Sequence, residues 1–205
     1  NPATARRLWG KKDFPKIGER YGFLTSGPTK PKVVTLYSTK GGSLKSTLVL
    51  NFARAAALHN KKVCVVGLDM QCDISMMLGF NLDGLADMTL KKALEEFNSY
   101  YSLYDLVSTV EKPSILDIIE TTDLPTLDYV PESPSLATLN EYLGTVPDPA
   151  RWIKNNVVDP LKSSYDLIVF DCSPNWNRLV NSALFATDLL ISPLECKINH
   201  FRNHP

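Results

Sequence analysis

The stretch Lys40-Gly41-Gly42-Ser43-Leu44-Lys45-Ser46-Thr47 decides the fold of this chain. An apolar run, 33–37, precedes it, and a helix-like run, 48–59, follows it. A strand, a glycine-bearing loop, a Lys-Ser pair and a helix, in this order, are what a phosphate-binding loop requires. The glycines let backbone amides approach the phosphates, and the helix directs its unpaired N–H groups and positive dipole end at the anion. We therefore predict a phosphate-binding loop here, the alternative being a basic turn between a strand and a helix.

Two residues of this loop have direct chemical roles toward a nucleotide. Lys45 can place its ammonium against the β- and γ-phosphates, and the Ser46 hydroxyl can ligate Mg²⁺. The common pattern G-x-x-x-x-G-K-[S/T] is not met in full, because Thr39 stands six residues before Lys45 and Leu44 stands immediately before it. A second lysine, Lys40, precedes the two glycines instead.

Length and composition indicate one α/β domain with a full core. The chain has 205 residues, of which 44% are hydrophobic and 21% charged, as in ordinary globular proteins. Lys+Arg and Asp+Glu both number 22, so a broadly basic nucleic-acid surface is not supported, while a local basic patch remains compatible. No run reaches the roughly 18 apolar residues of a membrane span, and the amino-terminal end shows no signal-peptide core.

The cysteines favour a reduced, cytosolic protein. They are scattered without a C-x-x-C pair, and three lie in or beside apolar strand-like runs. We therefore expect free thiols rather than disulfides or zinc ligands. The four are Cys64, Cys72, Cys172 and Cys196.

The first 31 residues differ in character from the rest. They show no sustained apolar period, and prolines at 28 and 31 close them as a linker. We expect 1–31 to be a basic tail or linker from an upstream segment and 32–205 to be the main domain, lacking its C-terminal part. A phosphate-contacting DNA arm is the alternative for the tail. Its basic residues are Arg6, Arg7, Lys11, Lys12, Lys16 and Arg20.

Two later strand-like runs each end in an aspartate. The run 62–68 leads into Asp69, and the run 167–170 leads into Asp171. Apolar runs without polar alternation suit a parallel sheet covered on both faces, so we predict a mostly parallel twisted sheet flanked by helices on both faces. Such sheets bind ligands at the carboxyl ends of their strands, where Asp171 can hold Mg²⁺ through a water. For Asp69, a simple helix cap is the alternative.

The remaining elements are expected from shorter patterns. We predict a strand over 127–131. Further helices are expected over 89–97, 103–107, 115–119, 136–143 and 151–161, the last stopped by Pro160.

Three ordered motifs resemble those of the ParA/MinD superfamily of deviant Walker-A P-loop ATPases, over residues 32–201. K-G-G-x-x-K-[S/T]-[S/T] at 40–47 resembles the family's phosphate loop. The segment 67–71, G-L-D-M-Q, resembles its D-x-D-P-Q motif, with Gly67 in place of the first aspartate. Y-D-L-I-V-F-D-C-S-P at 165–174 is similar to its Y-D-x-I-I-I-D-x-P-P strand. The segments 181–184, N-S-A-L, and 188–195, D-L-L-I-S-P-L-E, also resemble family segments, which implies a helix and a strand there. The nearest resemblance is to ParA-type plasmid and chromosome partition ATPases.

The resemblance implies ATP and Mg²⁺ as ligands and assigns roles to single residues. Ser46 and Asp171 would fix Mg²⁺, and Asp69 would orient the attacking water. Lys40 would reach across a face-to-face homodimer to the partner's nucleotide, so that Lys40, Lys45 and Asp69 form the catalytic set. The nucleotide-binding residues would be Lys40, Gly41, Gly42, Ser43, Leu44, Lys45, Ser46 and Thr47, with Thr47 at the α-phosphate.

The resemblance also implies a function, a dimeric switch ATPase that drives DNA partition. Its ATP-bound dimers would bind DNA without sequence specificity, and a cargo- or centromere-binding partner protein would stimulate hydrolysis. The protein would be cytoplasmic and associated with the nucleoid when ATP is bound. Leu44 and Gly67 depart from the family pattern, so we expect slow turnover. The alternatives are a MinD-like membrane-associated positioning ATPase, a metabolic member such as the nitrogenase iron protein, and a nucleotide-gated binding module without turnover.

Overall fold

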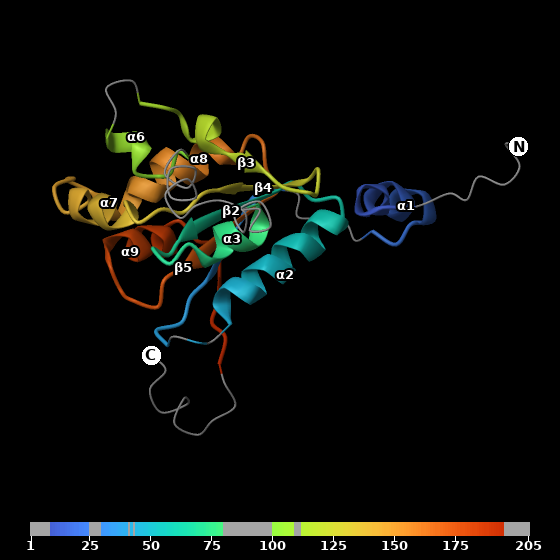
Figure 1. The fold of residues 1–205 in the computed structure, drawn as a ribbon, viewed down its shortest axis with the longest axis horizontal. Helices are drawn as coiled ribbons and strands as arrows, with labels where there is room; N and C mark the ends of the chain where they lie inside the picture. The colour runs from blue at the N-terminus through green and yellow to red at the C-terminus, as the bar shows by residue number, and fades with distance from the viewer. Residues whose placement is uncertain are drawn as a thin grey trace, which may run out of the picture.

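One mostly parallel sheet forms the centre of the protein (Figure 1). The computed structural model describes residues 9–24, 30–40, 42, 44–79, 100–108 and 112–194. Within these residues the strand order is β3-β4-β2-β5-β1-β6, and every neighbouring pair is parallel except β3 and β4. The predicted fold class is therefore confirmed. The strands are β1 Lys32–Leu36, β2 Val63–Leu68, β3 Glu120–Thr121, β4 Leu127–Val130, β5 Leu167–Cys172 and β6 Leu189–Ile191.

Helices cover both faces of this sheet (Figure 1). The helices α2 and α3 pack on one face, and α7, α8 and α9 pack on the other. The helices are α1 Phe14–Tyr21, α2 Lys45–Leu58, α3 Asp73–Leu78, α6 Asp105–Ser108, α7 Leu136–Tyr142, α8 Asp159–Leu161 and α9 Arg178–Phe185. Shorter helical turns are η2 Lys11–Asp13, η3 Ile115–Ile118 and η4 Pro149–Arg151, and η5 Lys154–Val158 is a π-helical turn.

Alternate residues of each central strand enter two separate cores. In β1, Val33 belongs to the core under α7–α9 and Val34 to the core under α2 and α3. Ile168 and Val169 of β5 divide in the same way, and all four are at most 4% exposed. Burial on both faces explains why these strands are continuous apolar runs in the sequence.

Most predicted elements are present, with several differences at their ends. The helical run that starts at Pro149 continues through Pro160 to Leu161, because the π-helical turn η5 just before it accommodates the missing proline N–H. The predicted strand 188–195 is shorter, Leu189–Ile191. The predicted helix 89–97 lies outside the described residues.

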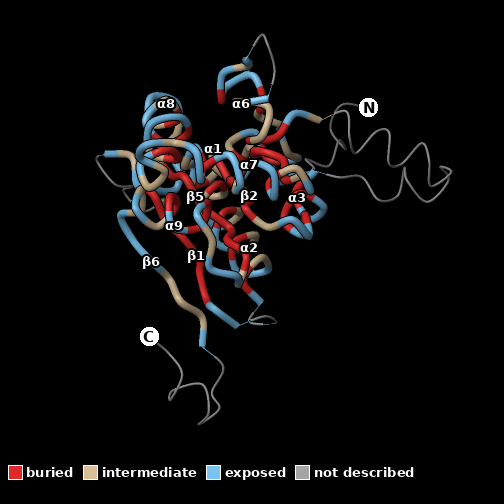
Figure 2. The backbone as a smooth tube through the Cα atoms, turned by 90° about the vertical axis from the view of Figure 1, so that its left-hand side faces the viewer, coloured by how far each residue is buried: buried red, intermediate tan, exposed pale blue. Residues whose placement is uncertain are grey.

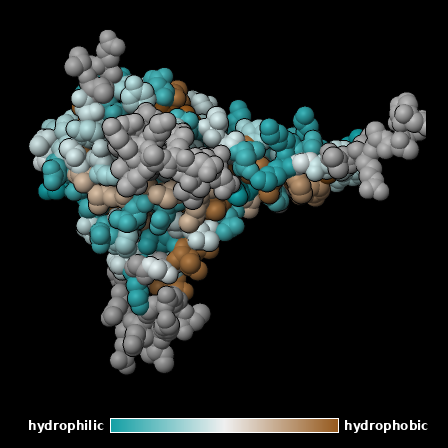
Figure 3. Space-filling model, in the orientation of Figure 1, coloured by the Kyte–Doolittle hydropathy of each residue, from teal (hydrophilic) through white to brown (hydrophobic). Residues whose placement is uncertain are grey.

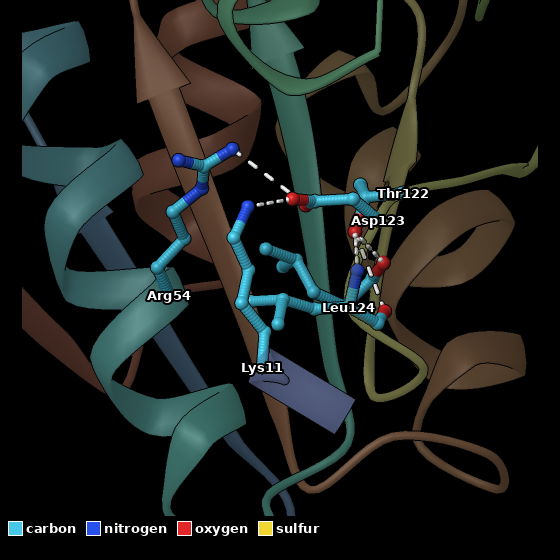
Figure 4. Close-up of polar contacts among 6 residues, drawn as sticks. Lys11, Arg54, Thr122, Asp123 and Leu124 are labelled. Carbon is cyan, nitrogen blue, oxygen red and sulfur yellow. Dashed lines mark hydrogen bonds and ion pairs between the residues drawn. The ribbon is translucent and has the colours of Figure 1, made fainter. Parts of the chain in front are cut away.

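The amino-terminal stretch, for which we predicted no element, contains η2 and α1. Lys11 forms an ion pair with Asp123, and Arg54 of α2 lies 3.7 Å from the same carboxylate (Figure 4). Farther along α1, Glu19 accepts a hydrogen bond from Asn60 at 2.6 Å. Asp123 precedes β4 and Asn60 precedes β2, so α1 attaches at the amino ends of the strands, away from the phosphate-loop edge. Exposed ion pairs of this kind stabilise weakly.

The exposed surface is less polar near two elements. Figure 2 shows the central strands buried and β6 more open, and Leu189 and Leu190 of β6 are about half exposed. Figure 3 shows an apolar area over the first half of α2, where Leu44, Leu48 and Phe52 are exposed at four-residue spacing on one side. In the described ranges, no helix combines the length and apolar composition that crossing a bilayer requires.

Candidate functional site

The ends of three central strands meet at one edge of the sheet. Asp171, near the end of β5, is in register with Leu36 of β1 on one side and Gly67 of β2 on the other. The predicted phosphate loop leaves β1 at this edge, and the segment with Asp69 leaves β2 there. Parallel pairing of β1, β5 and β2 thus brings together motifs that are widely separated in the sequence.

The phosphate loop turns into α2 through residues with left-handed backbones. Gly42 has φ 75° and Leu44 has φ 56° with ψ 27°. For leucine this conformation costs roughly 1–2 kcal/mol, and the 68% exposure of Leu44 means that little burial offsets it. The expectation that leucine is strained here is consistent with this geometry. Gly41 and Ser43 lie outside the described residues.

The Lys45 side chain is buried and contacts the backbone of its own loop. It is only 8% exposed, and its Nζ donates a hydrogen bond to the carbonyl oxygen of Lys40 at 3.3 Å. Helix α2 begins at Lys45 with no side-chain cap and no acidic residue in its first turn. Its first N–H groups therefore have no side-chain acceptor and can bind an anion, and the Lys45 ammonium lies at the same helix end. Thr47 is in the first turn of the same helix and is exposed.

Asp171 is a buried carboxylate that lacks a hydrogen-bond partner. It is 1% exposed, and neither of its oxygens has a partner in hydrogen-bonding geometry among the described residues. Burial raises the pKa of Asp171 to about 6, while the neighbouring Ser46 hydroxyl and the Lys45 ammonium oppose that rise. A buried, unpaired carboxylate is costly unless another group satisfies it.

The pair of Ser46 and Asp171 fits Mg²⁺. One hydroxyl and one carboxylate, with waters and phosphate oxygens completing the octahedron, are typical ligands of Mg²⁺ at a nucleotide. Within the described ranges, no group of three or more His, Cys, Asp or Glu side chains could hold a metal by itself.

Asp69 lies at the same edge and is not the cap of α3. Its Oδ1 accepts a hydrogen bond from the Gln71 N–H at 3.1 Å, and its carbonyl accepts one from the Cys72 N–H at 3.1 Å. The N-cap of α3 is Cys72, which has a left-handed φ of 60°. The charge of Asp69 contributes to the raised pKa of Asp171, so the two carboxylates are electrostatic neighbours.

Sequence reasoning missed one acidic residue of this edge, Glu132. It follows β4 and Pro131 directly, and it is 3% exposed. Burial, followed by the charge of Asp171, raises the pKa of the Glu132 carboxyl to about 8. The available signal was its position, because a charged residue immediately after a parallel strand lies at the ligand-binding edge of the sheet.

An aromatic pair borders the phosphate loop on another side. The rings of Tyr37, at the end of β1, and Trp176, in the loop after β5, meet edge to face with centroids 6.0 Å apart. Tyr37 is buried, whereas Trp176 is 63% exposed. The Trp176 ring therefore links the segment after β5 to the segment after β1, and it is exposed to solvent.

The described cysteines are free and buried, as expected. Burial raises the pKa of Cys64, Cys72 and Cys172, that of Cys72 to about 12. Such thiols stay protonated near neutral pH and are poor nucleophiles. Cys172, although adjacent to Asp171, is therefore a packing residue. Cys196 lies outside the described residues.

Comparisons with known proteins agree with this geometry. Residues 31–202 match the family described as the AAA domain. The sporulation initiation inhibitor protein Soj of Bacillus subtilis is 28% identical over 167 residues, which cover 81% of this chain and 59% of that protein. The chromosome partitioning protein ParA of Myxococcus xanthus is 27% identical over 180 residues, covering 88% of this chain and 56% of that protein.

Solved structures share the fold. A plasmid partition protein from Borrelia burgdorferi B31 bound to AMPPNP superimposes with a TM-score of 0.68 at 25% identity. The match covers 85% of this chain and 67% of that one. The chain spans less than three-fifths of the length of Soj and of ParA, the two curated relatives described above.

Proposed function

Because the chain belongs to the AAA domain family and is a P-loop ATPase of the ParA/MinD type, we propose that it is a dimeric switch ATPase that drives DNA partition. It would bind ATP, hydrolyse it slowly and change its affinity for DNA with the nucleotide. The names of its relatives support the choice of partition. The curated relatives include proteins named for chromosome and plasmid partition.

One observation carries the nucleotide-binding part of the proposal. The ammonium of Lys45 and the hydroxyl of Ser46 lie at the uncapped start of α2, beside the unpaired carboxylate of Asp171. On binding, Lys45 would exchange its hydrogen bond with the Lys40 carbonyl for one with a phosphate oxygen, which is charge-assisted and stronger. Ser46 and Asp171 would hold Mg²⁺, Asp171 through a water. Mg²⁺, when bound, would neutralise part of the charge on the phosphate oxygens.

Hydrolysis in this proposal depends on positioning more than on covalent chemistry by the protein. The loop amides, Lys45 and Thr47 would fix the phosphates, and Asp69 would orient the attacking water. Lys40 would act in trans on the nucleotide of a second copy. The γ-phosphate would therefore face the full set of lysine ammonium groups only in the dimer. The strained backbone at Leu44 supports slow turnover, since the loop is not in its most relaxed conformation.

The DNA-binding part of the proposal rests on the names of the curated relatives, which include chromosome and plasmid partition proteins. With a net charge of zero, the chain would contact phosphates through local basic patches, as part of a nucleoid-associated, cytoplasmic cycle. A cargo- or centromere-binding protein would stimulate hydrolysis and release the DNA.

The test of the nucleotide site is the Lys45→Ala variant. It removes the main point charge facing the phosphates, so ATP binding should become undetectable by titration calorimetry. Lys32→Ala is the matched control, because Lys32 is an exposed lysine at the opposite end of β1. Near-normal ATP affinity in Lys45→Ala would remove the phosphate-loop assignment.

The test of the partition role is DNA binding in different nucleotide states. With a slowly hydrolysed ATP analogue the protein should bind duplexes of unrelated sequence, and binding should weaken steeply as salt is raised. With ADP it should not bind. ATP-dependent binding to anionic vesicles without DNA binding would favour the MinD-like alternative. ATP binding without any turnover would favour a binding module.

A further inference from the structure

A buried acidic side chain that the proposed mechanism does not use lies beside Gly67. Glu132 comes just after β4, whose pairing with β2 ends at Val130 opposite Val66. The chain beyond β4 therefore continues alongside the end of β2, where Gly67 is the next residue after Val66. The Glu132 side chain is 3% exposed at this position.

The carboxyl group of Glu132 binds both ends of the connection from β2 to α3. Its Oε1 accepts a hydrogen bond from the Asp69 N–H at 3.1 Å. Its Oε2 accepts from the N–H and the hydroxyl of Ser75 at 3.3 and 3.2 Å, and the Glu132 N–H donates to the Ser75 Oγ at 2.8 Å. One side chain from the segment after β4 thus fixes the backbone on either side of residues 70–74.

The same carboxyl group fills the space next to Gly67. A Cβ atom at position 67 would lie 2.1 Å from Cγ, 2.3 Å from Cδ and 2.5 Å from Oε1 of Glu132. Contacts this short do not occur, so a side chain at 67 and the present Glu132 conformation exclude each other. Position 67 is where the resembling motif has its first aspartate. In this chain the acidic group at that place comes from Glu132, in the segment after β4.

We propose that Glu132 is a positioning residue for Asp69, and that from the segment after β4 it replaces the acidic side chain that Gly67 lacks. The inference rests on the proposed ATPase function, in which Asp69 orients water. Between the two anchored ends the chain passes through Cys72 at φ 60°, a conformation that persists only when its surroundings hold it. Glu132 supplies that hold through its hydrogen bonds to the Asp69 N–H and to Ser75, of which those to Ser75 are buried from water.

The first arm of the test separates turnover from binding. Glu132→Ala should lower kcat at least about tenfold, since a misplaced catalytic group can cost up to about 100-fold. ATP affinity should stay within about threefold of wild type, because Lys45 and Ser46 lie on α2 and are untouched. Asp69→Ala is the reference for complete loss of this role. Glu132→Gln, which can still accept from the Asp69 N–H, should fall between wild type and Glu132→Ala. An unchanged kcat in Glu132→Ala overturns the proposal.

The second arm exchanges the acidic group between strands. Gly67→Asp alone should unfold at lower temperature, because the new side chain overlaps Glu132. In the double variant Gly67→Asp/Glu132→Ala, the new carboxyl group at 67 occupies the space that the Glu132 carboxyl has left. The double variant should therefore be more stable than Gly67→Asp. It should also turn over faster than Glu132→Ala, because an acidic group is again present beside Asp69. A double variant no faster than Glu132→Ala, or a Gly67→Asp variant with wild-type stability and turnover, contradicts the replacement.

Hydrogen exchange without nucleotide keeps this test separate from the proposed function. In Glu132→Ala the amides of residues 69–75 should exchange faster, while those of α9, which packs in the core on the other face of the sheet from α3, should not change. Unchanged exchange in residues 69–75 overturns the positioning role whatever the turnover. If the wild type neither binds nor hydrolyses ATP, the proposed function fails, and exchange alone decides whether Glu132 holds the Asp69 segment.

Discussion

At the scale of single residues, Leu44 has a backbone conformation that suits glycine better than leucine. Its φ of 56° lies in the left-handed region, and its side chain is 68% exposed, so burial compensates little of the strain. Leu48, four residues later, is also partly exposed but lies inside α2. The same substitution at these two positions should therefore have opposite effects on stability.

We expect Leu44→Gly to have a free energy of unfolding equal to that of wild type or higher by up to about 1 kcal/mol, because relief of strain exceeds the added unfolded-state entropy. Leu48→Gly should be destabilised by about 1 kcal/mol or more, since glycine is unfavourable inside a helix. Urea unfolding measures both. Equal destabilisation of the two variants would mean that the left-handed conformation at Leu44 carries no strain.

The predicted site residues and the missed one differ in the kind of signal they carry. Lys45, Ser46 and Asp171 stand in motifs whose order and spacing are visible in the sequence, and parallel strand pairing brings them together. Glu132 belongs to no motif, and its importance follows from a contact with Gly67, 65 positions earlier. Such a contact depends on the register of β4 against β2, which the sequence does not state.

At the scale of elements, the sequence predicted best those strands that are buried on both faces. β1, β2 and β5 are continuous apolar runs because each face of the sheet is covered by helices. α1 was missed because Gly18 is its only buried residue, so it has no apolar core pattern. It is defined instead by local signals, a proline in its first turn and a left-handed Gly22 at its end. β3, with two residues, is too short for any periodicity.

The contact between β4 and α3 predicts a dependence of stability on pH. Burial and the charge of Asp171 raise the pKa of Glu132 from 4.5 to about 8, so the folded state binds a proton that the unfolded chain releases. This contribution is fully present below pH 4.5 and is lost as the pH rises to about 8. The free energy of unfolding should fall by at most about 1.4 kcal/mol per pH unit in this range.

Urea unfolding of the nucleotide-free protein at pH 6 and pH 8, for wild type and Glu132→Gln, measures this dependence. The wild type should lose stability between the two values, and the variant, which cannot titrate at this position, should lose less. The pKa of Asp171 is also raised, to about 6, so its titration lies mostly below this range. Identical losses in the two proteins would show that Glu132 is not protonated in the folded state.

At the scale of the whole molecule, the proposed dimer depends on Lys40. If Lys40 reaches the partner's nucleotide, Lys40→Ala should leave ATP affinity of the monomer nearly intact and weaken ATP-dependent dimerisation. A charged hydrogen bond contributes roughly 1.5–3 kcal/mol, and a symmetric dimer makes it twice. Allowing for partial offset by the rest of the interface, dimer affinity should fall by tens- to thousands-fold.

Sedimentation at several protein concentrations, with a slowly hydrolysed ATP analogue, measures the dimer constant. The same runs with ADP serve as the control, because neither protein should dimerise there. If Lys40→Ala and wild type dimerise alike with the analogue, Lys40 acts within its own subunit or has no role at the nucleotide.

The edge-to-face pair of Tyr37 and Trp176 gives this protein a built-in optical probe. Of its three tryptophans, Trp152 is buried, Trp9 lies before η2, and Trp176 contacts Tyr37, three residues before the phosphate loop begins at Lys40. Replacing Trp9 and Trp152 by phenylalanine would leave one fluorophore, whose emission is sensitive to solvent and to the neighbouring phenol ring. Loading and release of a nucleotide could then be followed in real time by intrinsic fluorescence, without any attached dye.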